Sequence, residues 1–393
     1  MEYDFSVMTN RRNTNSLKWD VAEHELPMWV ADMDFQTAPE IIVAIRRKME
    51  AGIFGYGIVP DAYYVAIIGW WNQRHHFTLE KDWIVFCTGV VPAISSVVRK
   101  MTTPGEKVLV QPPVYNIFYN SIVNNGRLVE PCDLKYRDGA YTIDFEDLEK
   151  KLSDPQVSLM ILCNPHNPVG NIWDRETLER IGELCWRHHV LVVSDEIHCD
   201  LTDPGYAYTP FASVSEHCAM NSITCIAPTK AFNLAGLQTA SVVVPNEVIR
   251  HKVWRGLNTD EVAEPNAFAI EAAIAAFNDG EPWLEALRAY LLENKNAIRD
   301  YLAAELPQIS VVPSQATYLM WLDCSKVTWL STELYRYIRR ETGLILSSGE
   351  EFGGDGKRFL RLNAACPRER LMEGLERLKR AVPAYEEWNL ARC

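Results

Sequence analysis

Short apolar runs alternate with amphipathic helical patterns through the middle of the chain. The runs are rich in Val, Ile and Leu and lack the polar alternation of half-exposed strands, which is typical of strands covered on both faces. The clearest helical pattern follows Asp174, a favourable N-cap residue. This alternation predicts an α/β fold with a mostly parallel sheet. The predicted strands are Ile84–Cys87, Val108–Gln111, Leu159–Cys163, Val190–Ser194, Ser222–Ala227 and Ala240–Val244.

The two ends of the chain have a different pattern. The first forty-odd residues hold few periodic signals and are predicted to form an arm that packs on another part of the molecule. The last third predicts a smaller α+β unit, so we expect a large domain over residues 48–284, and an arm and small domain over 1–47 and 285–393. Its predicted elements are a helix over Trp283–Leu306, a strand over Ser310–Leu322, a helix over Ser331–Thr342, a strand over Phe359–Leu362 and a helix with Pro367 at its first position.

Composition places the chain among soluble globular proteins, since 48% of the 393 residues are hydrophobic and 23% are charged. Lys and Arg total 39 against 52 Asp and Glu, a formal charge of −13. We therefore expect no nucleic-acid or membrane partner, because both would need positive charge facing phosphate. Ten cysteines without a Cys-x-x-Cys pair, and a start without a secretory pattern, predict a cytoplasmic protein.

Chemically distinctive residues follow five of the predicted strands. In an open parallel sheet, ligands bind beyond the carboxyl ends of the strands, so these residues are expected to meet. They provide an anion-binding turn, an aromatic ring, an amide, a carboxylate and an amine, which is the set that pyridoxal 5′-phosphate (PLP) needs. The five segments are Thr88–Pro92, Pro112–Tyr115, Asn164–Gly170, Asp195–His198 and Pro228–Lys230.

Several of these motifs resemble a known family. Asn164–Gly170, Ser194–His198, Thr229–Gly236 and Arg361–Asn363 look like the motif set of fold-type I PLP enzymes, the aminotransferases of classes I and II. The resemblance covers essentially the whole chain and implies a large domain with a seven-stranded, mostly parallel sheet covered by helices, beside a smaller α+β domain.

A narrower resemblance is to the carbon–sulfur β-lyase subgroup (cystathionine β-lyase, MalY/PatB-like). It rests on Ala31–Phe35, Phe54–Gly57, the Asp-Glu-Ile-His run that begins at Asp195, and Trp283-Leu284. This subgroup cleaves amino-acid substrates, and the resemblance therefore implies a small-molecule amino-acid substrate. It also implies a homodimer with shared sites.

The resemblance also implies a role for individual residues. Lys230 would form a Schiff base with PLP and then transfer the substrate Cα proton. Asp195 would pair with the pyridinium nitrogen, and Asn167 would bind the 3′-oxygen of the ring. Tyr115 would stack on the ring. Arg361 would bind the substrate carboxylate, for which a planar two-point donor is suitable.

Further cofactor contacts are expected around the phosphate and the ring. The amides of Gly89, Val90 and Val91 would bind the phosphate at a helix start. His198 stands where many class I aminotransferases have Tyr, and we include it among the cofactor-binding residues. Thr229 supplies the hydroxyl nearest to Lys230 in the sequence.

Some positions extend the site or depart from the family pattern. Tyr56 would reach the cofactor phosphate of the neighbouring subunit, and Asp32 and Trp29 are expected to contact substrate. Gln238 replaces a common phosphate-binding Arg, and Ala227 replaces a common Ser. These departures favour the lyase subgroup over dicarboxylate transaminases.

The predicted reaction is cleavage of an L-cysteine thioether to a thiol, pyruvate and ammonia. Two alternatives stay open: an aminotransferase of apolar amino acids, and a PLP-bound regulatory protein that acts through protein contact. Cys185, His188 and His189 share a helix face, but without a His-Glu-x-x-His pattern we expect no metal site.

Overall fold

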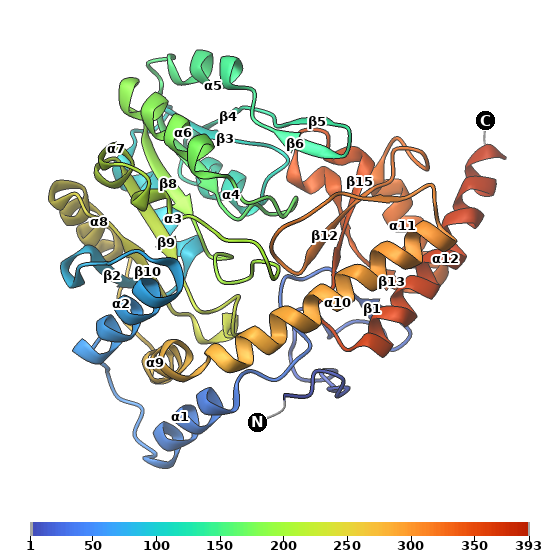
Figure 1. Cartoon of the computed structure of the whole chain (residues 1–393), viewed down its shortest axis with the longest axis horizontal. Coiled ribbons are helices and arrows are strands. Elements are labelled where there is room, and N and C mark those ends of the chain that lie inside the picture. The colour runs from blue at the N-terminus through green and yellow to red at the C-terminus, as the bar shows by residue number, and fades with distance from the viewer. Residues whose placement is uncertain (1–2, 392–393) are drawn as a thin grey trace.

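A seven-stranded sheet forms the centre of the molecule in the computed structural model, which describes residues 3–391 (Figure 1). Only β10 runs against its neighbours β2 and β9, so the predicted mostly parallel sheet is confirmed. In spatial order the strands are β2 (Ile84–Cys87), β10 (Ala240–Val243), β9 (Ser222–Ile226), β8 (Leu191–Asp195), β7 (Val157–Cys163), β3 (Lys107–Val110) and β4 (Leu128–Pro131).

Helices cover both faces of this sheet, which explains the unbroken apolar runs. In β7, Leu159 and Ile161 pack on one face, whereas Met160 and Leu162 pack on the other. One face carries α3 (Val90–Met101), α4 (Ile117–Val123) and α8 (Glu247–Thr259). The opposite face carries α2 (Asp61–His75), α5 (Phe145–Leu152), α6 (Arg175–Arg187), α7 (Glu216–Met220) and α9 (Ala269–Asp279), with α1 (Pro39–Glu50) packed on α9.

Local signals explain the start of α6 and the absence of β4 from the predicted strands. Asp174 caps α6 by accepting a hydrogen bond from the Thr177 amide at 2.8 Å, as its N-cap pattern predicts. β4 was not predicted because it lacks an apolar run. It is an edge strand whose residues are exposed or half-buried.

The last third forms a second sheet with its own apolar core, to the right in Figure 1. The long helix α10 (Glu281–Glu305) crosses the predicted boundary at residue 284 and joins the two parts. The strands, antiparallel throughout and in spatial order, are β11 (Ser310–Val311), β12 (Leu319–Asp323), β15 (Phe359–Asn363) and β14 (Ser347–Ser348), covered by α11 (Ser331–Thr342) and α12 (Arg368–Leu390).

Two details of the predicted C-terminal elements are wrong. The run Ser310–Leu322 is not one strand, because residues 312–318 leave the strand path between β11 and β12, with Thr317 at a φ of +68°. Pro367 is the N-cap of α12 and not its first helical residue.

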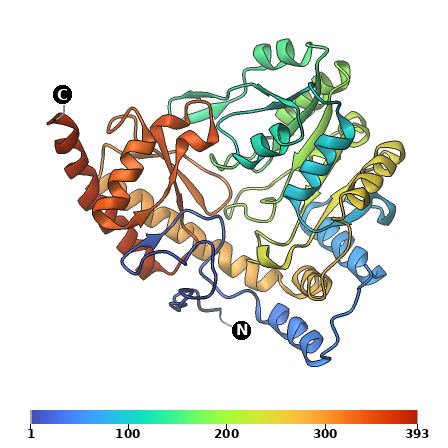
Figure 2. The same cartoon turned by 180° about the vertical axis from the view of Figure 1, so that it is seen from behind.

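The N-terminal arm runs beside the second sheet, as both views show (Figures 1 and 2). Its strand β1 (Leu26–Pro27) pairs in parallel with β13 (Leu344–Ile345). The prediction that the arm packs on another part of the molecule is therefore confirmed, whereas the domain boundaries stay a prediction. The remaining elements are the hairpin β5 (Lys135–Arg137) and β6 (Ala140–Thr142), and the 3-10 turns Lys81–Trp83, Phe211–Ser213, Ala235–Leu237, Gly349–Phe352 and Gly356–Arg358.

Two general properties of the described chain concern its cysteines and its helices. Nine cysteines are buried and unpaired in the described chain, while Cys393 lies outside it. Within residues 3–391, every helix is too short or too polar to span a bilayer.

Candidate active site

One cavity lies beyond the carboxyl ends of the central strands, where the sequence predicts the chemistry. It brings together most of the predicted cofactor residues. The predicted residues that line it are Gly89, Val90, Val91, Tyr115, Asn167, Asp195, His198, Thr229 and Lys230.

Lys230 lies in the turn that follows β9, and its amine reaches the N-terminal arm. Its Nζ atom donates a hydrogen bond to the backbone oxygen of Ala31 at 2.6 Å. Burial, with a smaller effect of the Arg361 charge, lowers the pKa of Lys230 to about 8. About a tenth of this amine is therefore neutral, and able to act as a nucleophile or base, at pH 7, far more than for an ordinary lysine.

Asp195 ends β8 and is almost fully buried. Its carboxylate accepts a hydrogen bond from the Ile197 amide at 3.2 Å. Burial raises the pKa of Asp195 to about 6, because the charged form loses solvation. A buried carboxylate of this kind is suited to a cationic N–H partner.

Arg361 on β15 does not line the cavity but contacts the lining residue Asn167. Its guanidinium donates to Asn167 Oδ1 at 3.0 Å, to the Trp29 backbone oxygen at 3.0 Å and to Ser347 Oγ at 3.3 Å. It also lies over the Phe352 ring, 4.8 Å from the centroid. Arg361 therefore connects the strand ends, the arm and the second sheet.

Two buried nitrogen atoms near the cavity have no hydrogen-bond partner among residues 3–391: His198 Nδ1 and Arg361 Nε. Burial, with the charges of Lys230 and Arg361, lowers the pKa of His198 to about 3, so this ring is neutral. Buried polar atoms normally find partners. These two atoms are therefore available to a polar ligand.

The start of α3 lies in the cavity lining. Gly89 is the N-cap, and Val90 and Val91 are the first helical residues. The first amides of a helix have no intrahelical acceptor and favour anions. A Cβ atom at position 89 would lie 3.2 Å from the Pro92 ring, so the turn is tight enough to favour glycine.

Four predicted residues lie outside the cavity lining: Arg361, described above, and Tyr56, Asp32 and Trp29. Tyr56 is fully exposed on the loop between α1 and α2. The Asp32 carboxylate pairs with Arg11 at 2.6 Å. Trp29 meets the site through its backbone oxygen, the acceptor for Arg361.

Sequence reasoning assigned no site role to several lining residues, although Thr88 lies in the predicted anion-binding turn and Gln238 at a departure from the family pattern. Ala31, Thr88 and Gln238 line the cavity, the last in a left-handed conformation at φ +53°. Tyr318 donates to the same Ala31 oxygen as Lys230. Ala31 carries no functional side chain, and only its place in the folded arm reveals its role.

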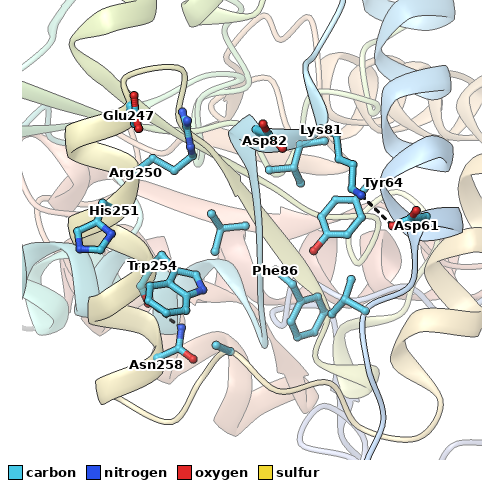
Figure 3. A pocket seen from close by; sticks show the side chains of 14 residues that line it. Asp61, Tyr64, Lys81, Asp82, Phe86, Glu247, Arg250, His251, Trp254 and Asn258 are labelled. Atoms are coloured by element: carbon cyan, nitrogen blue, oxygen red, sulfur yellow. Dashed lines mark hydrogen bonds and ion pairs between the residues drawn. The ribbon is translucent and has the colours of Figure 1, made fainter.

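A wider hollow lies beside the edge strand β2, between α8 and the start of α2 (Figure 3). Two of its basic side chains have local partners: Lys81 pairs with Asp61 at 2.8 Å, and Arg250 donates to the backbone oxygens of Val244 and Pro245 at 2.8 Å. None of the predicted site residues lines it, so the strand-end cavity is the candidate active site.

A fold of this kind with this site is that of the aminotransferase class I and II family, whose model matches residues 26–378, and the chain belongs to that family. Among its relatives, the cystathionine β-lyase PatB of Bacillus subtilis (strain 168) is 44% identical over 96% of this chain and 100% of PatB. Protein MalY of Escherichia coli (strain K12) is 33% identical over 97% and 99%.

A solved structure agrees with this placement. Cystalysin from Treponema denticola, whose crystal structure contains a pyridoxal 5′-phosphate cofactor, superposes with a TM-score of 0.95 at 32% identity, covering 98% of this chain and 100% of cystalysin. The resemblance found from the motifs, including that to the MalY/PatB-like subgroup, is confirmed.

Proposed function

We propose that this chain is a PLP-dependent carbon–sulfur β-lyase that cleaves an L-cysteine thioether to a thiol, pyruvate and ammonia. The observation that carries the proposal is the full-length similarity to PatB, a cystathionine β-lyase. The gathering of an amine, a carboxylate and an amide around one cavity, with the Arg361 guanidinium bonded to that amide, supports it.

The residues at the cavity fit PLP. The start of α3 offers amides to a phosphate, Asp195 offers a buried carboxylate to a pyridinium nitrogen, and Lys230 offers an amine to the aldehyde group. The unpaired His198 Nδ1 is a further polar atom for this ligand. When bound, PLP supplies an electron-accepting ring that stabilises negative charge at the substrate Cα.

The protein groups then carry the proton and the substrate. Lys230 in its neutral form takes the Cα proton, which its lowered pKa permits near neutral pH. Arg361 binds the α-carboxylate and thereby orients the Cα–H bond. The Cβ–S bond breaks with its electron pair on sulfur, the thiolate leaves, and the released 2-aminoacrylate hydrolyses to pyruvate and ammonia.

Product analysis tests the proposal directly. The purified protein, loaded with PLP, is incubated with L-cystathionine, and pyruvate and free thiol are measured together. Equal amounts of both products are expected. Exchange of amino groups with a 2-oxo acid, without pyruvate from any cysteine thioether, would instead assign the chain as an aminotransferase.

Two finer features belong to this proposal. A homodimer with shared sites would cover the exposed loop that holds Ile53, Phe54, Tyr56 and Ile58, and would bring Tyr56 to the partner's cofactor phosphate. A reducing cytoplasmic location suits nine buried, unpaired cysteines. Sedimentation of the wild type and a Tyr56→Asp variant tests the dimer, since a charge on a buried interface should yield monomers.

A further inference from the structure

The segment of the arm that meets the cavity, residues 29–33, is held by side chains from distant parts of the chain. The Nδ2 atom of Asn363 on β15 donates hydrogen bonds to the backbone oxygens of Val30 and Asp32, at 2.6 and 2.7 Å. Asn233 binds both the amide and the oxygen of the last residue of the segment, each at 3.0 Å. The peptide units before and after the one that carries the Ala31 oxygen are thereby fixed in direction.

The Ala31 oxygen accepts two donors. Lys230 Nζ lies 2.6 Å away and the Tyr318 hydroxyl 3.0 Å away. Tyr318 is completely buried, so its hydroxyl has little freedom to exchange this bond for one with water. A backbone oxygen has two lone pairs, and here both are used.

A neutral acceptor is chemically appropriate for an amine that must act as a base. A carboxylate at this distance would favour the ammonium form. In that form the nitrogen lone pair already holds a proton and cannot accept another. A backbone oxygen can instead bind one N–H of the neutral amine and leave the nitrogen lone pair free. It also restrains a long, flexible side chain, whose disorder would slow proton transfer.

We propose that the Ala31 oxygen holds the free ε-amino group of Lys230 in its working position, and that Tyr318 is a positioning residue that acts on Lys230 through this oxygen. The proposal rests on the proposed function, because it assumes that Lys230 is the amine that captures PLP and moves the Cα proton. Tyr318 itself need not touch substrate or cofactor.

The experiment compares Tyr318→Phe with Tyr385→Phe. Tyr385 is an equally buried tyrosine whose hydroxyl bonds Thr328 Oγ1 at 3.0 Å, within the core of the second sheet. Two rates are measured: PLP capture by the apo-protein, from the absorbance of the bound cofactor, and exchange of the Cα proton of L-alanine with deuterium in the loaded protein, by NMR. The affinity for L-alanine is measured separately.

Both rates are expected to fall about ten-fold in Tyr318→Phe, with the alanine affinity within two-fold of wild type and both rates unchanged in Tyr385→Phe. The proposal is overturned if both variants behave alike, if the rates do not fall, or if the affinity falls in step with them. If Tyr318→Phe does not fold, Asn363→Ala, which frees the carbonyls on both sides of Ala31, is expected to show the same pattern, and wild-type rates in that variant overturn the proposal. A wild type that neither captures PLP nor exchanges alanine would contradict the proposed function instead.

Discussion

The strand ends of the central sheet and the arm segment over residues 29–33 meet at the same cavity, but they contribute different chemical groups. The strand ends supply side chains: the carboxylate of Asp195, the amide of Asn167 and the amine of Lys230. The arm segment supplies backbone oxygens, one to Lys230 and one to Arg361. One region carries the reactive groups, and the other orients them.

The two regions are also held in place differently. The strand ends inherit their positions from the backbone ladder of the sheet, where β7, β8 and β9 pair in register. The described part of the arm has the two-residue strand β1 and a few further backbone bonds, such as that from the Asp34 amide to the Ala365 oxygen at 2.9 Å. Side-chain bonds and charge pairs add to them. Asp34 is buried among Lys18, Arg11 and Arg370, at 3.2, 2.9 and 3.2 Å. A site can therefore be rigid in one half through topology and in the other through specific polar contacts.

Removal of Lys230 should have the largest effect. In Lys230→Ala, the release of pyruvate from L-cystathionine is expected to fall at least about 10⁴-fold, because both the covalent attachment and the proton transfer are lost. Lys326→Ala, a change at an exposed lysine, serves as the control and should keep full activity. Substantial turnover in Lys230→Ala would contradict the reactive role that we assign to the strand ends.

Neutralising Asp34 tests whether charge holds the arm. Burial alone would raise the pKa of Asp34, but Lys18, Trp19 and Arg370 outweigh it and hold the pKa below its ordinary value. Asp34→Asn removes the carboxylate that pairs with Arg370 and leaves Lys18 and Arg11 with Asp32 alone. It should lower the free energy of unfolding, measured with urea at pH 7, by about 3–5 kcal/mol.

This Asp34 contribution should fade as the pH falls below the ordinary aspartate pKa, because the carboxylate becomes protonated in both states, first in the unfolded one. Asp20→Asn at an exposed position should change stability little. Equal stabilities of the two variants at pH 7 would show that the arm does not depend on this charge cluster.

Arg361 joins the two regions, so its shape should matter as well as its charge. Arg361→Lys keeps the charge but loses the planar fork that reaches Asn167 and the arm together. The value of kcat/KM is expected to fall about ten- to hundred-fold, equivalent to about 1.5–3 kcal/mol, mainly through KM. Arg336→Lys on the exposed face of α11 is the matched control, and a wild-type KM in Arg361→Lys would place the carboxylate elsewhere.

The final prediction changes only the pH and concerns PLP capture by the apo-protein. Since the pKa of Lys230 is lowered to about 8, the neutral fraction rises about ten-fold per pH unit below 8 and levels off above it. The capture rate, followed by absorbance, should have the same shape. A rate that keeps rising toward pH 10 would mean that the cavity does not desolvate this amine.

Sequence reasoning reached the strand-end half of the site and most of the fold. Hydrophobic periodicity and apolar runs placed six of the seven central strands within two residues of their observed bounds, because these strands are buried on both faces. The edge strand β4 and the break between β11 and β12 were missed, because neither has a distinctive local pattern. The candidate reactive residues could be named from the sequence because the residue type alone identifies a carboxylate, an amine or a guanidinium.

The sequence by itself therefore determined the α/β class, the strand ends that carry the chemistry, and the cofactor that this set of groups suits. Only the tertiary structure decided that the Ala31 oxygen meets Lys230, that Tyr318 shares it, and that Asp32 pairs with Arg11 rather than lining the cavity. The reason is physical: every residue carries the same backbone oxygen, so its role depends wholly on where the folded chain places it.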